Sequence, residues 1–282
     1  MSRAGRLSLR VLLLETLSDV DRAEDLLVWR SVEKTAASEV AEEISHPVET
    51  ISKTDEKISI VIPTFNEEDY LSDTLNSLKC RNNFEVIVVD GGSTDKTPEI
   101  AEREGCRLIF SDPGRSLQAN AGASMASGSI LFFLHADTRL PFGFDCAIRA
   151  ALSRPGVVGG AFQLRIDGVG FLLRMIERAV TIRSRLLRMP YGDQGLFVHK
   201  NIFRELCGFA PLPIMEDFEF VRRLRDRGQI QILPLSLTTS DRRWRKLGPF
   251  STTLINQKVI LGYHLGISPD RLALWYGRRA NY

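Results

Sequence analysis

Two side chains with metal-binding and acid–base chemistry follow an apolar run near the middle of the chain. Residues Ile130 to Leu134 are apolar, and His135 and Asp137 come directly after them. Side chains two positions apart on an extended chain point the same way, so this pair could hold a divalent cation. A substrate diphosphate would complete so sparse a ligand set for Mg²⁺ or Mn²⁺. The alternative is a turn whose aspartate caps the next segment.

A second carboxylate ends another apolar run. Asp90 follows FEVIVV and precedes Gly91 and Gly92, which allow a ligand to approach the backbone closely. Its carboxylate could accept hydrogen bonds from a base or a ribose, or it could cap the turn that follows. No GxGxxG pattern follows the first apolar run, which continues as PTFNEE, so a dinucleotide site is not expected.

Further acids and bases lie in the second half of the chain. Glu216 and Asp217 open a predicted helix, where they could cap it or where one could act as a general base. Arg243 and Trp244 belong to the basic stretch DRRWRKLG. The arginines and the lysine of this stretch could neutralise a phosphate, or they could lie on a solvated surface loop.

The elements that must position these residues alternate between strand and helix from Ile58 to Leu134. We expect strands at 58–63, 84–90, 106–110 and 129–134, and helices beginning near residues 71, 97 and 115. This alternation predicts an open parallel sheet, in which ligands bind beyond the carboxyl ends of the strands. Glu67, Asp90 and Asp137 should therefore emerge on one rim.

The alternation weakens after Pro141. We expect strands around 157–166, 195–200 and 230–235, a basic amphipathic helix around 171–189 and a helix around 216–228. This half should extend the same sheet with mixed strand directions. The domain organisation is an N-terminal extension at 1–56, a main domain at 57–265 and a C-terminal tail at 266–282.

Composition limits the classes of protein to consider. The chain has 282 residues, of which 44% are hydrophobic and 26% charged, and a formal net charge of +2, which gives no case for nucleic-acid binding. The apolar runs are too short for a membrane helix of roughly 20 residues, although arginines on the amphipathic helix allow peripheral membrane contact. The four cysteines form no CxxC pair. We expect a cytoplasmic protein, with organelle import suggested only by three arginines before the first acid.

The order of these motifs resembles that of the family-2 glycosyltransferases. The stretches ISIVIPTFNEE, VIVVDGGSTDKT, FFLHADT, MEDFEF and DRRW occur in that order between about residues 57 and 260. The resemblance implies a GT-A fold, with a Rossmann-like, mostly parallel sheet flanked by helices and a mixed-sheet half on the acceptor side. The details LHADTRLP, YGDQGLFV and RRWRK further resemble a subgroup associated with arsenosugar biosynthesis.

The resemblance also implies roles for individual residues. The metal ligand would be Asp137, with His135 standing where the family commonly has an acid, and the catalytic base would be Asp217 beside Glu216. The residues implied to bind the nucleotide sugar, with Arg115 added here as a candidate for the phosphate charge, are Pro63, Thr64, Phe65, Glu67, Asp90, Arg115, Asp137, Arg243 and Trp244. Glu67, Asp90, Asp137 and Asp217 are expected to converge on a single cleft.

The expected function is inverting transfer of a sugar from a nucleotide diphosphate sugar to an unknown acceptor hydroxyl, with Mg²⁺ or Mn²⁺ as cofactor. A sugar-phosphate nucleotidyltransferase is an alternative, because it also uses a nucleotide, a cation and a Rossmann-like sheet. A catalytically silent nucleotide-sugar-binding scaffold is another, because His135 replaces an acid.

Overall fold

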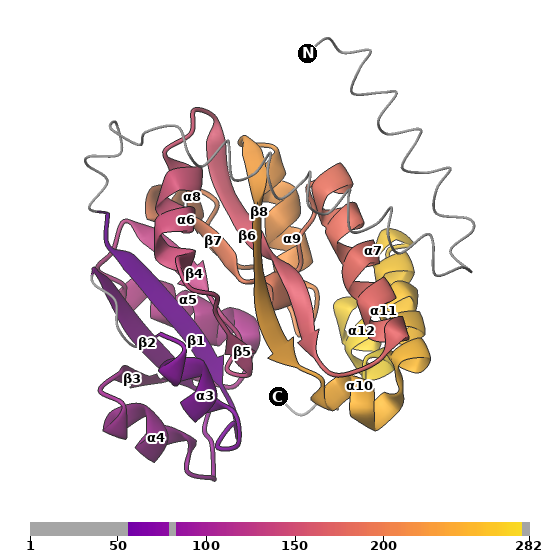
Figure 1. The fold of residues 1–282 in the computed structure, drawn as a ribbon, viewed down its shortest axis with the longest axis horizontal. Coiled ribbons are helices and arrows are strands. Elements are labelled where there is room, and N and C mark those ends of the chain that lie inside the picture. Colours follow the sequence, from indigo (N-terminus) through magenta and orange to yellow (C-terminus); the bar gives the residue numbers. More distant parts are fainter. Residues whose placement is uncertain (1–55, 79–82, 278–282) are drawn as a thin grey trace, which may run out of the picture. The chain divides into compact units, whose positions relative to one another are not determined.

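Residues 56–78 and 83–277 are described by a computed structural model, and they form a sheet covered by helices on both faces (Figure 1). Residues 1–55 of the predicted N-terminal extension lie outside the described residues. The strands are β1 (Ile58–Thr64), β2 (Phe84–Asp90), β3 (Arg107–Phe110), β4 (Ile130–Phe133), β5 (Thr138–Arg139), β6 (Val157–Asp167), β7 (Leu196–His199) and β8 (Gln229–Ser240). Their order in the sheet is β3-β2-β1-β4-β7-β6-β8-β5.

Helices and one short turn connect these strands. They are α3 (Leu71–Asn76), α4 (Thr97–Arg103), α5 (Arg115–Met125), α6 (Phe144–Leu152), α7 (Phe171–Leu187), η1 (Gly192–Gln194), α8 (Lys200–Glu205), α9 (Glu216–Arg225), α10 (Arg242–Leu247), α11 (Pro249–His264) and α12 (Pro269–Trp275). Two observations modify the expected picture. The DRRW stretch enters a helix, α10, and residues 269–275 of the predicted C-terminal tail form α12, in which Leu272 is buried.

The first half of the sheet is parallel, as its unbroken apolar runs predict. β1 pairs in parallel with β2 and with β4, and β2 pairs with β3. Alternate side chains of β1 enter different apolar clusters: Ile60 packs in the cluster that includes Phe144 of α6, and Val61 in the cluster that includes Ala123 of α5. Both faces are therefore covered, and the carboxyl ends of β1, β2 and β4 meet at one rim.

The second half mixes strand directions. β7 runs antiparallel to both β4 and β6, β8 runs parallel to β6, and the two residues of β5 pair antiparallel with Thr238 and Thr239 of β8. Gly160 of β6 allows a close approach here, because a Cβ at this position would overlap the Gln231 carbonyl and the Phe197 ring. The pairing of β5 with β8 brings the start of α10 to the rim where β4 ends.

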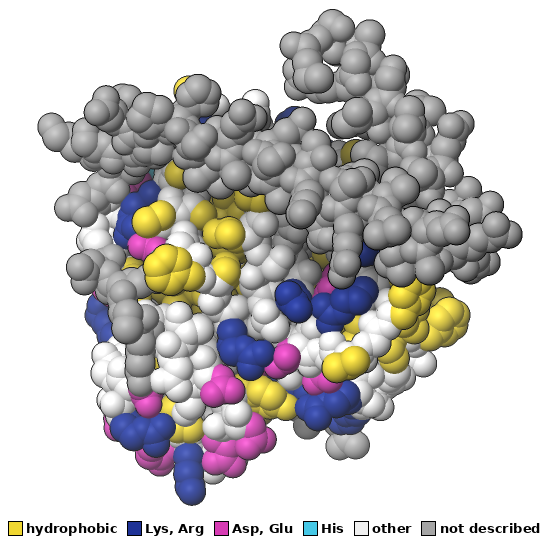
Figure 2. Space-filling model, in the orientation of Figure 1, with side chains coloured by type: hydrophobic (Ala, Val, Ile, Leu, Met, Phe, Trp, Pro, Cys, Tyr) yellow, Lys and Arg dark blue, Asp and Glu magenta, His cyan; other side chains and the backbone are white. Residues whose placement is uncertain are grey.

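The surface mixes charges and carries some apolar side chains. Figure 2 shows Lys and Arg interspersed with Asp and Glu on one face.

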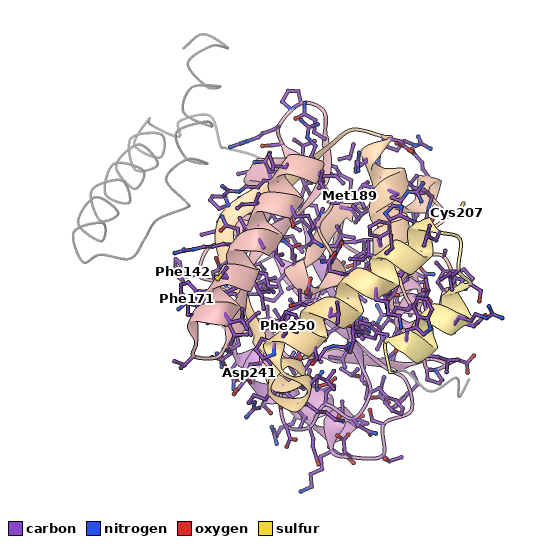
Figure 3. The ribbon with its side chains drawn as sticks, turned by 90° about the vertical axis from the view of Figure 1, so that its right-hand side faces the viewer. Phe142, Phe171, Met189, Cys207, Asp241 and Phe250 are labelled. Carbon is purple, nitrogen blue, oxygen red and sulfur yellow. The ribbon has the colours of Figure 1, made fainter. Side chains whose placement is uncertain are left out.

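Among the described residues, none of the helices combines the length and the apolar character that crossing a bilayer requires. On α7, which lies beside α11 in Figures 1 and 3, Phe171 is 78% exposed and Leu186 is 63% exposed. Peripheral membrane contact stays a prediction.

The packing of β4 gives a first test. Phe132 is fully buried and its ring lies near those of Phe144 and Phe162, whereas Phe250 at the start of α11 is 74% exposed (Figure 3). We expect Phe132→Ala to lower the free energy of unfolding by about 3–5 kcal/mol, because it removes apolar contacts and leaves a cavity. The matched change Phe250→Ala should alter it by less than about 0.5 kcal/mol. Urea denaturation of both variants measures this, and equal losses would contradict the packing described.

Candidate active site

An arginine joins two of the predicted site carboxylates. The Nη1 and Nη2 atoms of Arg242 donate to Oε2 and Oε1 of Glu67 at 2.7 and 2.8 Å, and its Nε lies 3.1 Å from Oδ2 of Asp137. Glu67 follows β1, Asp137 follows β4 and Arg242 opens α10. The β5–β8 pairing and the hydrogen bond from Ser240 N to Asp137 O set the third element against the other two. The guanidinium thereby balances two carboxylates at the rim.

Glu216 and Asp217 open α9, as expected. Asp217 accepts hydrogen bonds from the amide of Gly192 at 2.5 Å and from that of Phe218 at 2.7 Å, one on each carboxylate oxygen. Glu216 is 6% exposed and has contacts of its own. The carboxylate of Asp217 is therefore oriented by two backbone donors, an arrangement that suits helix capping and a positioned base alike.

Two adjoining cavities gather most of the predicted site residues. The smaller, of about 110 Å³, is lined by Pro63 and Glu67, and the larger, of about 630 Å³, by Arg243 and Trp244. The two share six lining residues, Arg115, His135, Asp137, Glu216, Asp217 and Arg242. The larger volume falls in the range typical of sites for small molecules, about 300–1,000 Å³. Acids from the loops after β1 and β4 and from α9 thus meet around one connected space.

Asp90 does not join them, so the expected convergence holds for three of the four carboxylates. It is fully buried and lines neither cavity. Its Oδ1 accepts from the amides of Gly92 and Ser93, and its Oδ2 from the hydroxyls of Thr64 and Ser93. The turn that follows β2 therefore uses the carboxylate, as the capping alternative described. Contact between Asp90 and a nucleotide base stays a prediction.

Two other predicted nucleotide-binding residues also lie outside both cavities. Thr64 is 1% exposed and donates to Asp90 at 3.1 Å, whereas Phe65 is 53% exposed at the end of β1. Both residues were predicted from their position at the end of the first strand. That position fixes which rim a residue reaches but not the direction of its side chain.

The charges around the cavities shift several pKa values. Desolvation lowers the pKa of His135 to about 4, helped by the positive charge of Arg115, so the imidazole is neutral at pH 7. Desolvation also acts to lower the pKa of Arg115, but nearby acids, Glu216 first, raise it above its usual value. Burial raises the pKa of Glu67 despite the opposing effect of Arg242. Arg115 lines both cavities.

The residues available to a divalent cation are Asp137 and His135. Within the described residues no group of three or more His, Cys, Asp or Glu side chains is placed to hold a metal ion. Among the residues that the structure describes, Oδ1 of Asp137 has only long contacts, of 3.5 Å, with the hydroxyls of Thr138 and Thr239. A carboxylate oxygen and a neutral imidazole fit a cation that takes its remaining ligands from phosphate and water.

Two segments supply residues to the cavities that the sequence analysis did not single out. In the sequence, Arg242 is one of several cations in DRRWRKLG. The pairing of β5 with β8 brings this arginine, and not its neighbours, into contact with Glu67 and Asp137. Arg243 instead lies over the Tyr276 ring, with its Cζ 3.6 Å from the centroid. The YGDQ stretch supplies Tyr191 and Asp193 to the wall of the larger cavity. The available signal there was a charged residue between a glycine and a glutamine in the stretch YGDQGLFV.

Comparison with known proteins bears on the family. A family model described as glycosyl transferase family 2 matches residues 59–212. An uncharacterized glycosyltransferase of Mycobacterium tuberculosis is 35% identical over 180 residues, covering 59% of this chain and 68% of the relative. The chain spans 68% of the length of that relative, but only 16% of the length of another match, the poly(ribitol-phosphate) beta-N-acetylglucosaminyltransferase TarS of Staphylococcus aureus.

Solved structures bear on the fold. TarS residues 1–349 of Staphylococcus aureus, in complex with UDP-GlcNAc, matches with a TM-score of 0.53 and 22% identity over 65% of this chain and 58% of that one. Glucosyl-3-phosphoglycerate synthase of M. tuberculosis, in complex with Mn²⁺, UDP and glucosyl-3-phosphoglycerate, gives 0.54 and 22% over 75% and 81%. These likenesses confirm the expected GT-A-like sheet with flanking helices. Since its family model covers more than half of the sequence, the chain belongs to glycosyl transferase family 2.

Proposed function

We propose that the chain is an inverting, metal-dependent glycosyltransferase that moves a sugar from a nucleotide diphosphate sugar to an acceptor hydroxyl. The observation that supports it most is that Asp137, Asp217 and Arg115 line the same connected cavities at the carboxyl rim of the sheet. This places two acids and a cation, from three separate elements, around a space large enough for a small substrate. Neighbours of the same fold are described as complexes with UDP-GlcNAc or UDP, which is consistent with such a donor.

In the proposed reaction Asp217 takes the proton of the acceptor hydroxyl. As the acceptor oxygen forms its bond to the anomeric carbon, the bond from that carbon to the diphosphate oxygen breaks, and the nucleoside diphosphate leaves from the opposite face. The two amides that hold the Asp217 carboxylate fix its direction without using a side chain. Arg115, which lines both cavities, would balance the negative charge of the leaving diphosphate.

Asp137, with His135 beside it, would hold the divalent cation. When bound, Mg²⁺ or Mn²⁺ would stabilise the negative charge that develops on the leaving diphosphate. One structural neighbour was solved with Mn²⁺, which supports a divalent ion of this kind. The resemblance to the subgroup associated with arsenosugar biosynthesis does not identify the base, the sugar or the acceptor, and it stays a prediction.

The base assignment predicts a loss of turnover. A screen of nucleotide sugars for thermal stabilisation, with and without Mn²⁺, first identifies the donor. We expect Asp217→Asn to lower the release of nucleoside diphosphate, with water as acceptor, by about 10²-fold or more, since general bases contribute about 10²–10⁴-fold. Asp226→Asn, which changes an exposed carboxylate after α9, serves as the control. Turnover of Asp217→Asn within twofold of the unsubstituted chain would refute the assignment.

The metal assignment predicts a loss of cation-dependent binding. Nucleoside diphosphate with Mn²⁺ should raise the melting temperature of the unsubstituted chain more than nucleotide with EDTA, because a ligand of the folded state stabilises it. Asp137→Ala should remove that difference. Asp167→Ala, at a carboxylate that is 53% exposed, should keep it. The same Mn²⁺ effect in Asp137→Ala would show that the cation binds elsewhere.

The Arg242 pairing predicts a pH-dependent loss of stability. The raised pKa of Glu67 should rise further in Arg242→Met, because the hydrogen bonds and the positive charge that oppose the shift are lost. Below pH 4.5 the carboxyl is protonated in both folded and unfolded chains, so it adds no penalty there. The loss of folding stability caused by the raised pKa of Glu67 grows as pH rises from 4.5 towards the pKa in the folded chain, because the carboxyl ionises first in the unfolded chain.

Urea denaturation at pH 4.5 and at pH 7 measures this change. The stability difference between Arg242→Met and the unsubstituted chain should be larger at pH 7. Arg245→Met, which changes a 66% exposed cation on the same helix, should show little pH dependence. A difference for Arg242→Met that is independent of pH would mean that Glu67 does not depend on the pairing.

A further inference from the structure

The outer side of α7 carries a row of exposed apolar side chains. Phe171, Met175, Ile182 and Leu186 are between 49% and 78% exposed. Successive members of this row are four, seven and four positions apart, a spacing that places them on one side of a helix with 3.6 residues per turn. On the opposite side of the helix, Leu173 belongs to the apolar core. One apolar side of α7 is therefore packed in the protein, and a second one is exposed.

The outer side of α11 repeats this pattern. Phe250, Leu254, Leu261 and, one residue past the helix, Leu265 have the same spacing and are between 60% and 74% exposed. Both helices lie on the side of the molecule that faces the viewer in Figure 3, and Figure 1 also shows them next to each other. The eight residues of the two rows therefore share one side of the molecule, and we call them the apolar face.

Basic side chains accompany the apolar face. Arg178 and Arg185 are exposed and lie three positions after Met175 and Ile182, and Lys258 is exposed on α11. In these two helices, both of which the structure describes, the only acid is a glutamate on α7 whose side chain is 13% exposed and pairs with an arginine of the same helix at 2.8 Å. The outer sides of the two helices are therefore apolar and positively charged, without an exposed acid.

This combination fits the surface of an anionic lipid bilayer. Exposed apolar rows with Lys and Arg beside them are typical of helices that lie in the plane of the bilayer interface, where apolar side chains enter the acyl boundary and cations meet lipid phosphates. Arginine side chains are long enough to reach the phosphates while their stems stay among apolar groups. A second copy of the chain fits less well, because a two-fold interface would bring the same cations against each other.

The inner side of α11 connects this surface to the proposed active site. Thr252, Asn256 and Val259 of α11 line the larger cavity. Lys246 and Leu247 of the preceding helix, α10, line it too, and both are exposed. A bilayer in contact with the apolar face would therefore lie one helix away from the cavity.

We propose that the outer sides of α7 and α11 bind the surface of an anionic membrane. In this peripheral contact the two apolar rows enter the interface, and Arg178, Arg185 and Lys258 meet the lipid phosphates. The contact is separate from the proposed reaction, because none of the eight apolar residues lines either cavity.

Sedimentation of the full chain with lipid vesicles tests the proposal. The partition coefficient onto vesicles of equal parts phosphatidylcholine and phosphatidylglycerol should exceed that onto phosphatidylcholine alone by about tenfold or more, because each basic residue near anionic lipid adds to the attraction. Binding to the mixed vesicles should weaken as the salt concentration rises. No binding to the mixed vesicles, or equal binding to both kinds, would overturn the proposal.

Serine pairs on each helix test the apolar rows. Met175→Ser with Ile182→Ser, and Leu254→Ser with Leu261→Ser, should each lower binding to the mixed vesicles about tenfold or more, because less apolar surface enters the bilayer. Their melting temperatures should stay close to that of the unsubstituted chain, because these side chains are exposed. Phe110→Ser, at a 68% exposed position that ends β3, is the matched control. Unchanged binding in both pairs would overturn the assignment.

A pair of arginine variants tests the charges. Arg178→Gln with Arg185→Gln should lower binding to the mixed vesicles about tenfold. Arg154→Gln with Arg204→Gln removes the same charge at two exposed positions outside α7 and α11, and it should have a much smaller effect. Equal losses in the two pairs would mean that net charge, and not this surface, causes the binding.

Sedimentation velocity distinguishes self-association from membrane binding. The unsubstituted chain should show no dimer that the serine pairs dissociate. Such a dimer, together with no binding to the mixed vesicles, would assign the apolar face to a second copy of the chain and overturn the proposal.

Discussion

The ion pairs of Arg242 hold the rim of the sheet together. This guanidinium contacts Glu67, which lies 175 positions earlier in the chain, and Asp137, which follows the central strand β4. Two partly buried carboxylates so close to each other repel, and a single bidentate cation between them offsets that repulsion. The negative charges of Glu216 and Asp217 act to raise the pKa of Arg115. The proposed catalytic space is therefore lined by both acids and arginines.

The parallel half of the sheet was predictable because its strands are buried on both faces. Continuous apolar runs such as Ile60–Ile62 and Ile130–Phe133 are buried on both faces of the sheet, and the position of Asp137 shortly after one run follows directly. The direction of a side chain at the rim was not predictable in the same way. Asp90 turns into its own loop because Gly92, Ser93 and Thr64 supply four donors, and such local competition is decided by backbone geometry.

The second half of the site depends on contacts between distant segments. The choice of Arg242 over Arg243 follows from the two-residue strand β5, which is too short to identify from an alternating or continuous apolar pattern. Family membership likewise identifies the kind of reaction but leaves the acceptor to the residues of this chain.

The central claim is that Asp137, Asp217 and Arg115 bound a single site for a nucleotide diphosphate and its cation. A crystal structure of the chain with a nucleoside diphosphate and Mn²⁺, with anomalous data collected for manganese, tests it most directly. The account predicts a manganese peak beside the Asp137 carboxylate, with the diphosphate between it and Arg115. A nucleotide bound outside the two cavities, or a manganese ion held by other side chains, would contradict it.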